Sequence, residues 1–285
     1  MFQRIGYTWT MMKASLDVLR KDKELLAFPL LSGIACLLVL ASFIAPLLTN
    51  TLPIPAKNAP PVEQAVFYGY CFLFYFCNYF VIVFFNTAVV ACAALRFEGH
   101  DPTLGDGLRA AVARLPQIVG WALLSATVGL ILRIIEDRSE KVGRFVAGLL
   151  GAAWTLVSFL AVPVLVLEKK GPFAALSGSA SLLKKTWGEQ LVGGFSFGLI
   201  FFLLGIPGWI GVVGGIFLLV SAAALPILAY GLLALGILYL VVLALVQSVL
   251  QTVFQTALYL YARDGRAPAG FTEELLGTAV AQGGK

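Results

Sequence analysis

The most informative shortage in this sequence of 285 residues is charge, because only 12% of the residues are charged while 60% are hydrophobic. A soluble domain is roughly a quarter charged and half apolar. A chain with half that charge, and with a mean hydropathy of +0.92, has too little polar surface for a water-soluble globule. The composition therefore predicts an integral membrane protein, with one helical membrane domain over residues 1–265 and a polar tail over 266–285.

Residues that carry catalysis are also scarce. His100 is the only histidine and lies in a polar stretch, so general-base catalysis has few candidates. The sequence has no HExxH, GxSxG or Walker motif in a soluble module, and no acid-rich cluster inside its apolar runs that would couple protons or cations. We therefore expect a protein that is not an enzyme and that binds no cofactor.

The four cysteines do not form a pattern that indicates a metal or redox site. Cys36, Cys71, Cys77 and Cys92 all lie inside apolar runs, and none has a CxxC partner. A free cysteine in such a run behaves as a small hydrophobic side chain. We expect all four to be buried apolar residues, and we expect no metal site.

Long apolar runs are what the sequence has in abundance. About 20 apolar residues cross a bilayer as a helix, and we predict an all-α polytopic membrane protein with about six spans. Two of the runs have ~36 residues, and such a helix measures ~54 Å against a hydrocarbon core of ~30 Å, so their ends should emerge from the membrane. The predicted spans cover residues 25–48, 65–96, 116–135, 143–167, about 190 onward, and 226–263.

One apolar stretch leaves its structure open. The segment 205–208, Gly-Ile-Pro-Gly, interrupts an apolar run that continues to Pro226. Proline and glycine disfavour helix interiors, so residues 205–226 fit a kinked long helix, a re-entrant hairpin or an extra short span. We favour a break at 205–208 on the far side of the membrane.

Amphipathic basic segments precede pairs of spans three times. In the first, residues 1–22, apolar residues such as Trp9 and Met12 recur every three or four positions, while the basic residues lie largely off that stripe. In the second, Thr103 and Asp106 have capping-box spacing and predict a helix start. The third follows Pro172. The predicted repeats, each an amphipathic helix plus a helix pair, cover about 1–98, 101–170 and 171–265.

The distribution of basic residues predicts which side these amphipathic helices occupy. Fifteen of the twenty Lys and Arg residues fall on the amphipathic side and five on the other. Such a bias favours a cytoplasmic location for the richer side. We therefore expect both termini on the cytoplasmic side of the inner (plasma) membrane. We expect a cytoplasmic collar that contacts anionic lipid and no nucleic acid. Candidate headgroup contacts are Arg20, Lys21, Arg114, Lys184 and Lys185.

Polar residues inside the predicted spans are candidates for function, because they are costly there. One interpretation is that their amides join helices by hydrogen bonds, and the other is a polar path or small-molecule cavity. At the far side, Arg133 either extends to the interface or pairs with Glu136 or Asp137. The candidate amides are Asn78, Asn86, Gln247, Gln251 and Gln255.

Several short motifs carry a resemblance to known proteins. They are FNTA at 85–88, LLKKTWGEQLVGG at 182–194 and FQTALYLYA at 254–262. With the repeated plan, they resemble a large group of prokaryotic polytopic membrane proteins of unknown function, similar to the membrane domain attached to some glycerophosphodiester phosphodiesterases. The resemblance covers residues 1 to about 265. The phosphodiesterase catalytic domain is absent, so the resemblance implies neither that activity nor any catalytic residue.

Three functions follow as expectations. The first is a non-enzymatic scaffold or accessory partner that acts through its cytoplasmic collar, with a possible protein partner. The second is a transporter, or a protein that handles a lipid or small molecule, with a cavity lined by the amides and aromatic residues. The third is sensing of membrane shape or lipid by the collar.

Overall fold

The structure, a computed structural model, describes residues 2–49, 51–52, 54–56, 59–138, 142–221 and 226–272, without the side chains of residues 2–8, 138 and 183–197. The described residues form helices and connections and include no strand, which confirms the all-α class. Among them, six segments are long and apolar enough to cross a membrane, as predicted. The helices are α1 (Phe2–Lys21), the 3-10 helix η1 (Lys23–Leu26), α2 (Ala27–Leu48), α3 (Pro61–Phe97), α4 (Leu104–Val112), α5 (Leu115–Arg138), α6 (Val142–Val157), α7 (Ala161–Leu167), α8 (Pro172–Val220) and α9 (Pro226–Asp264).

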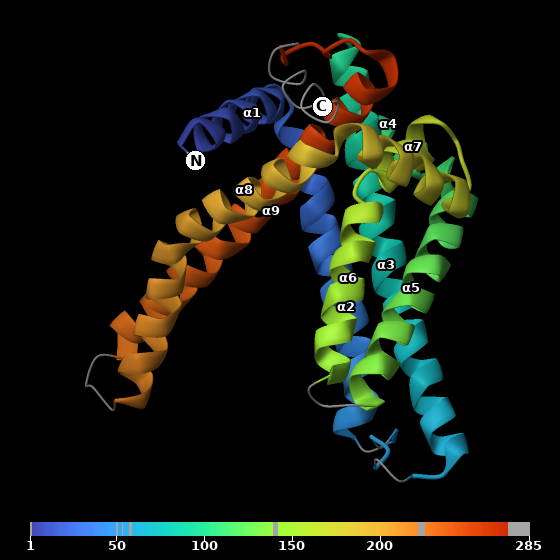
Figure 1. The fold of residues 1–285 in the computed structure, drawn as a ribbon. Coiled ribbons are helices and arrows are strands. Elements are labelled where there is room, and N and C mark those ends of the chain that lie inside the picture. Colours follow the sequence, from blue (N-terminus) through green and yellow to red (C-terminus); the bar gives the residue numbers. More distant parts are fainter. Residues whose placement is uncertain are drawn as a thin grey trace.

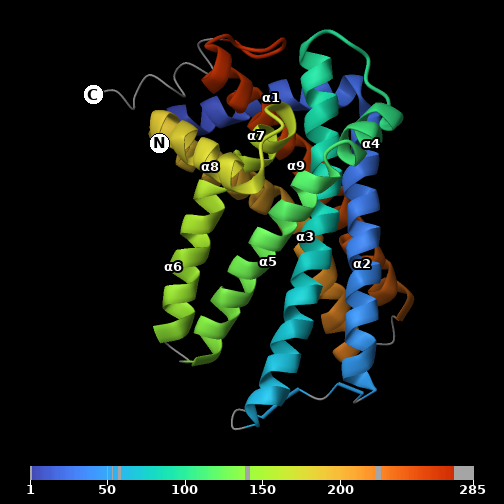
Figure 2. The ribbon, with the colours of Figure 1, turned by 90° about the vertical axis from the view of Figure 1, so that its right-hand side faces the viewer.

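Four of the long helices stand in a single row. Figure 2 shows them in the order α6, α5, α3 and α2, and each contacts its neighbour in that order. The other two, α8 and α9, pair as a hairpin that starts at one end of the row and diverges from it (Figure 1). We call this end, formed by α1, α4, α7, the first turns of α8 and the last turns of α3 and α9, the collar end. The opposite end of the row is the far end.

The packed core lies at the collar end. One buried cluster joins α1, α3 and α9, and a second joins α3, α5 and α7. In α3 the buried residues begin at Val83, and in α9 most of them follow Val249. The two helices have 37 and 39 residues, so each has a half that packs among the short helices and a half with an exposed apolar surface. This arrangement matches the expectation that the long spans meet the amphipathic segments.

The start of α4 follows directly from its sequence. Thr103 is the N-cap residue, and its hydroxyl accepts a hydrogen bond from the Asp106 backbone N–H at 3.3 Å. The Thr103 backbone N–H donates to the Asp106 carboxylate at 3.0 Å, which completes the predicted capping box. The Thr103 hydroxyl also donates to the Asp106 carboxylate at 2.7 Å, and this bond together with the one from the backbone N–H holds the pKa of the Asp106 carboxyl below its ordinary value.

The fourth predicted span is broken, which the sequence did not lead us to expect. Instead of one helix over 143–167, α6 ends at Val157 and α7 begins at Ala161. Pro163 has no N–H to donate to the carbonyl of Phe159, and proline is tolerated in the first turn of the new helix. The backbone N–H of Leu160 donates instead to the hydroxyl of Ser179, a buried residue of α8, at 3.1 Å.

The favoured break at 205–208 is wrong. Helix α8 continues from Pro172 to Val220 with Pro207 inside it, so the third amphipathic segment and the fifth span are one helix. The glycines of this segment allow α8 and α9 to pack closely, because the two helices cross at positions that have no side chains. A Cβ added to Gly236 would lie 2.8 Å from the carbonyl oxygen of Gly208.

Candidate functional site

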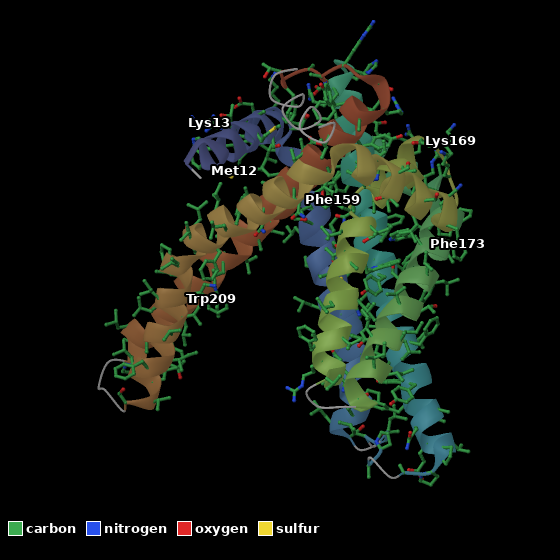
Figure 3. All side chains as sticks on the ribbon, viewed as in Figure 1. Met12, Lys13, Phe159, Lys169, Phe173 and Trp209 are labelled. Atoms are coloured by element: carbon green, nitrogen blue, oxygen red, sulfur yellow. The ribbon has the colours of Figure 1, made fainter. Side chains whose placement is uncertain are left out.

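The collar end carries exposed cations on several elements. On α1, Lys13 and Arg20 are exposed, and Lys21 is exposed at its end. The Arg20 guanidinium lies 3.6 Å from the carboxylate of Asp17. Figure 3 shows Lys13 and Lys169 at this end, on opposite sides of the molecule. Two further predicted headgroup contacts, Lys184 and Lys185, have side chains outside the described residues.

Arg114 differs from Arg20 and Lys21, the predicted headgroup contacts that are exposed on α1. Its residue is half-buried, and its Nε donates to the backbone carbonyl of Val166 at 3.2 Å. This hydrogen bond joins the α4–α5 connection to the end of α7. The guanidinium therefore positions collar elements against each other.

A buried ion network fixes the first helices against α3. Asp22, between α1 and η1, is 6% exposed, and its carboxylate accepts hydrogen bonds from Nε and Nη2 of Arg96. Arg96 Nη2 also donates to Asp101, which follows α3. No local sequence pattern pairs these three residues. The available signal was an acidic residue at a helix junction and an arginine at the end of a long apolar run.

A second polar cluster joins the end of α7 to α9. The Tyr259 hydroxyl donates to Glu168 Oε1 at 2.6 Å, and Lys170 Nζ lies 2.5 Å from Glu168 Oε2. Burial alone would raise the pKa of the Glu168 carboxyl, but these two hydrogen bonds and the charges of Lys170 and Arg263 outweigh it and lower that pKa. The Arg263 guanidinium also lies over the Tyr259 ring, 5.5 Å from its centre. Glu168 is therefore a structural anion at the collar end.

The five amides are half-buried and are not brought together by any hydrogen bond among the described residues. The Asn78 amide nitrogen donates to the carbonyl of Phe74 in its own helix at 3.0 Å. Gln247 follows Leu240 and Leu243 at helical spacing, and both leucines lie against Gly205 of α8, so Gln247 is on the side of α9 that faces α8. Both interpretations of the amides stay predictions. The half-buried set is Asn78, Asn86, Gln247, Gln251 and Gln255.

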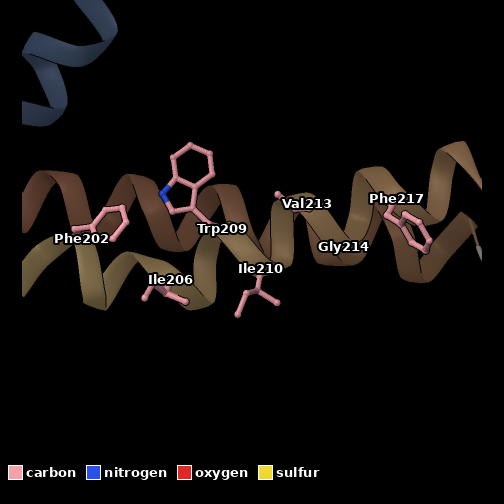
Figure 4. A pocket seen from close by; sticks show the side chains of 7 residues that line it. All are labelled: Phe202, Ile206, Trp209, Ile210, Val213, Gly214 and Phe217. Atoms are coloured by element: carbon pink, nitrogen blue, oxygen red, sulfur yellow. The ribbon is translucent and has the colours of Figure 1, made fainter.

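Two apolar hollows lie on the α8–α9 hairpin. The first, of about 700 Å³, is lined by side chains that project from one side of α8 (Figure 4). The second, of about 510 Å³, follows the crossing of the two helices beside Gly211 and Gly236. Neither contains any of the five amides, and apolar surfaces of this kind suit lipid chains. The first hollow is lined by Phe202, Ile206, Trp209, Ile210, Val213, Gly214 and Phe217.

A charged cavity lies at the far end of the row. Of the two alternatives for Arg133, the structure shows the ion pairs: its Nε lies 3.3 Å from the Asp137 carboxylate, and its Nη1 lies 4.0 Å from that of Glu136. With Arg144 and neighbouring residues of α3, these side chains enclose about 760 Å³. None of the five candidate amides lines this cavity either.

The cysteines and acids give no metal site in the part of the chain that the structure describes. Over those residues no group of three or more His, Cys, Asp and Glu side chains could hold a metal ion. The cysteines are free thiols. Cys92 is buried, as expected, whereas Cys36, Cys71 and Cys77 are half-buried on surfaces of α2 and α3.

Comparison with known proteins identifies the family to which the chain belongs. A search of curated proteins finds no match. The family model of DUF6159, described as a family of unknown function, matches residues 65–271, from the first turns of α3 to the residues after α9. The match therefore includes Arg96, the cluster around Glu168 and the α5 and α6 side chains of the far-end cavity, whereas Asp22 and Gln64 lie outside it. Because it covers most of the chain, this protein belongs to the DUF6159 family of unknown function.

Proposed function

We propose that this protein is a non-enzymatic scaffold or accessory partner of the inner (plasma) membrane, with its collar end at the cytoplasmic surface. The observation that carries the proposal is the position of the packed core. Both buried clusters lie at the collar end, while the rest of the long helices has exposed apolar surfaces suited to lipid. A fixed, charged end on a lipid-embedded frame is the arrangement that a docking platform requires.

Anionic lipid would hold the collar at the membrane surface. Apolar side chains are exposed beside cations there: Trp9 is 44% exposed, with Lys13 Nζ 5.7 Å from its ring centre. Phe173, four positions after Lys169, is 73% exposed, and both residues lie on the same side of the molecule in Figure 3. An apolar side chain next to a Lys is the usual anchor of a helix lying in the headgroup region.

The alternative functions have less support from the geometry. Transport or lipid handling through an amide-lined cavity would need the amides to share a cavity, and none of the three cavities described above contains one. Sensing of membrane shape or lipid by the collar would need the apolar stripe of residues 1–22 to enter lipid. Met11, Met12 and Leu19 are buried within the protein instead. The likeness to the phosphodiesterase membrane domain stays an expectation from the sequence.

The proposal is tested by crosslinking and affinity capture of the full-length protein from its native membranes. Replacing Lys13, Arg20 and Lys21 with glutamine should reduce recovery of a specific partner about tenfold or more, because steering by rim charges would be lost. The matched control is the charge-conserving triple variant Lys13→Arg, Arg20→Lys and Lys21→Arg, which should retain the partner. Recovery of no partner by the unmodified protein, together with a solute flux that it carries, would contradict the scaffold proposal.

A further inference from the structure

The far-end cavity is independent of the collar and has the size of a ligand site. It lies where α3 begins, α5 ends and α6 begins, with residues 54–56 along one side. Its volume of about 760 Å³ falls in the range of small-molecule sites, about 300–1,000 Å³. In the part of the chain that the structure describes, its polar or charged lining side chains are Gln64, Tyr68, Arg133, Glu136, Asp137 and Arg144.

Among the described residues that line this cavity, positive and negative charges are equal in number. Arg133 pairs with Asp137 and Glu136 within α5, and Arg144 of α6 adds a second cation. The side chains of Arg133, Glu136 and Asp137 are 45%, 42% and 36% exposed, so each keeps room for another partner. Two cations and two carboxylates do not favour a simple anion or a simple cation. The complementary ligand carries both charges.

The position of the cavity indicates which zwitterion it would meet. Three candidate spans have ends there, Pro61–Phe97, Leu115–Asp137 and Val142–Leu167, and span ends lie at the level of lipid headgroups. Phe67 and Tyr68 line the cavity, and aromatic residues are typical of that level. The headgroup of a zwitterionic phospholipid carries a phosphate and an ammonium close together.

We propose that this cavity binds a zwitterion with a phosphate and a primary ammonium, as in the headgroup of phosphatidylethanolamine. The ammonium takes the place of Arg133 beside Glu136 and Asp137, because it can donate three hydrogen bonds to carboxylates. Arg133 then joins Arg144 on the phosphate, for which guanidinium groups have matching geometry. A choline headgroup has no N–H to donate, and a glycerol headgroup has no cation. The cavity therefore selects ethanolamine over both.

The test is native mass spectrometry of the full-length protein, purified in detergent and offered equal amounts of phosphatidylethanolamine, phosphatidylcholine and phosphatidylglycerol. We expect phosphatidylethanolamine to be retained about tenfold more than the other two, since hydrogen bonds between charged groups are strong enough for that ratio. The double variant Glu136→Gln and Asp137→Asn should lose the preference over phosphatidylcholine. Arg144→Gln should reduce retention of both phosphatidylethanolamine and phosphatidylcholine, because it removes a guanidinium from the phosphate.

The control is an exposed carboxylate at the collar end, Glu98→Gln, whose side chain is 67% exposed and which should leave lipid preference unchanged. If the double variant shows no cooperative thermal unfolding transition, and so is not folded, the single change Glu136→Gln replaces it in the test. Water-soluble phosphoethanolamine, added in competition, separates the two sources of this chemistry: displacement of the lipid at similar concentration identifies a site for the free headgroup, and no displacement identifies a lipid site. Equal retention of the three lipids by the unmodified protein, or an unchanged preference in the double variant, would overturn the assignment.

Discussion

Replacing Arg96 with alanine is expected to destabilise the folded protein by about 3–5 kcal/mol, the usual cost of removing one partner of a buried ion pair. Asp22 is 6% exposed, and in the described part of the chain its only ion pair is the one with Arg96. The alanine variant leaves that carboxylate buried without a countercharge. The free energy of unfolding of the detergent-solubilised protein is the quantity to measure.

Arg109→Ala is the control for this change, because it removes the same side chain from the same end of the molecule. Arg109 is 82% exposed, and its guanidinium lies 3.4 Å from the Asp106 carboxylate. Exposed pairs of this kind contribute about 0–1 kcal/mol, so this variant should be close to the unmodified protein. Equal losses in the two variants would show that the Asp22–Arg96 contact does not stabilise the collar end.

Gly236→Ala is expected to be less stable than Gly231→Ala by about 1–3 kcal/mol, the range for overpacking a close contact. At Gly236, an added Cβ would lie 2.8 Å from both the Gly208 carbonyl oxygen and the Val212 nitrogen. These are backbone atoms of α8, so they cannot move without separating the two helices. At Gly231, five positions earlier in the same helix, no atom lies within 4 Å.

The comparison between these two glycines cancels the other effect of the substitution. Alanine is favoured over glycine in a helix interior by about 1 kcal/mol, and that gain applies at both positions. Thermal unfolding of the two variants in the same detergent therefore reports the contact between α8 and α9. If Gly236→Ala unfolds at the same temperature as Gly231→Ala, the hairpin does not pack as closely as described.

Features fixed by a few neighbouring residues could be predicted from the sequence. The six spans follow from apolar length, and the start of α4 follows from Thr103 and Asp106. The ion pairs of Arg133 could be proposed from the sequence because Glu136 and Asp137 lie three and four positions further along the same helix. Each of these features is determined by local composition and residue spacing.

Features fixed by distant partners could not be predicted. Arg96 and Asp22 are 74 positions apart, and no local pattern pairs them. Pro207 and its neighbouring glycines were predicted to break the helix. The residue against which they pack, Gly236 of α9, is distant in sequence, so a local pattern in α8 cannot indicate it. The interruption between Val157 and Ala161 depends in the same way on a hydroxyl from Ser179.

The far-end cavity depends on such distant contacts as well. Arg133 and Arg144 belong to adjacent helices, but Tyr68 and residues 54–56 come from an earlier part of the chain. The sequence therefore indicated the ion pair without the cavity around it. For the amides both interpretations stay predictions, because the one hydrogen bond that the described residues show, from Asn78 to the Phe74 carbonyl, lies within a single helix.

The central claim is that the basic segments before each pair of spans share one side of the membrane. Compartment-specific reporters fused after Lys21, Arg114 and Lys185 test it most directly, with fusions after Ala56 and Asp137 as the opposite-side comparison. The account predicts cytoplasmic signals from the first three fusions and none from the last two. Reporters after Lys21, Arg114 and Lys185 that fall in different compartments would contradict it.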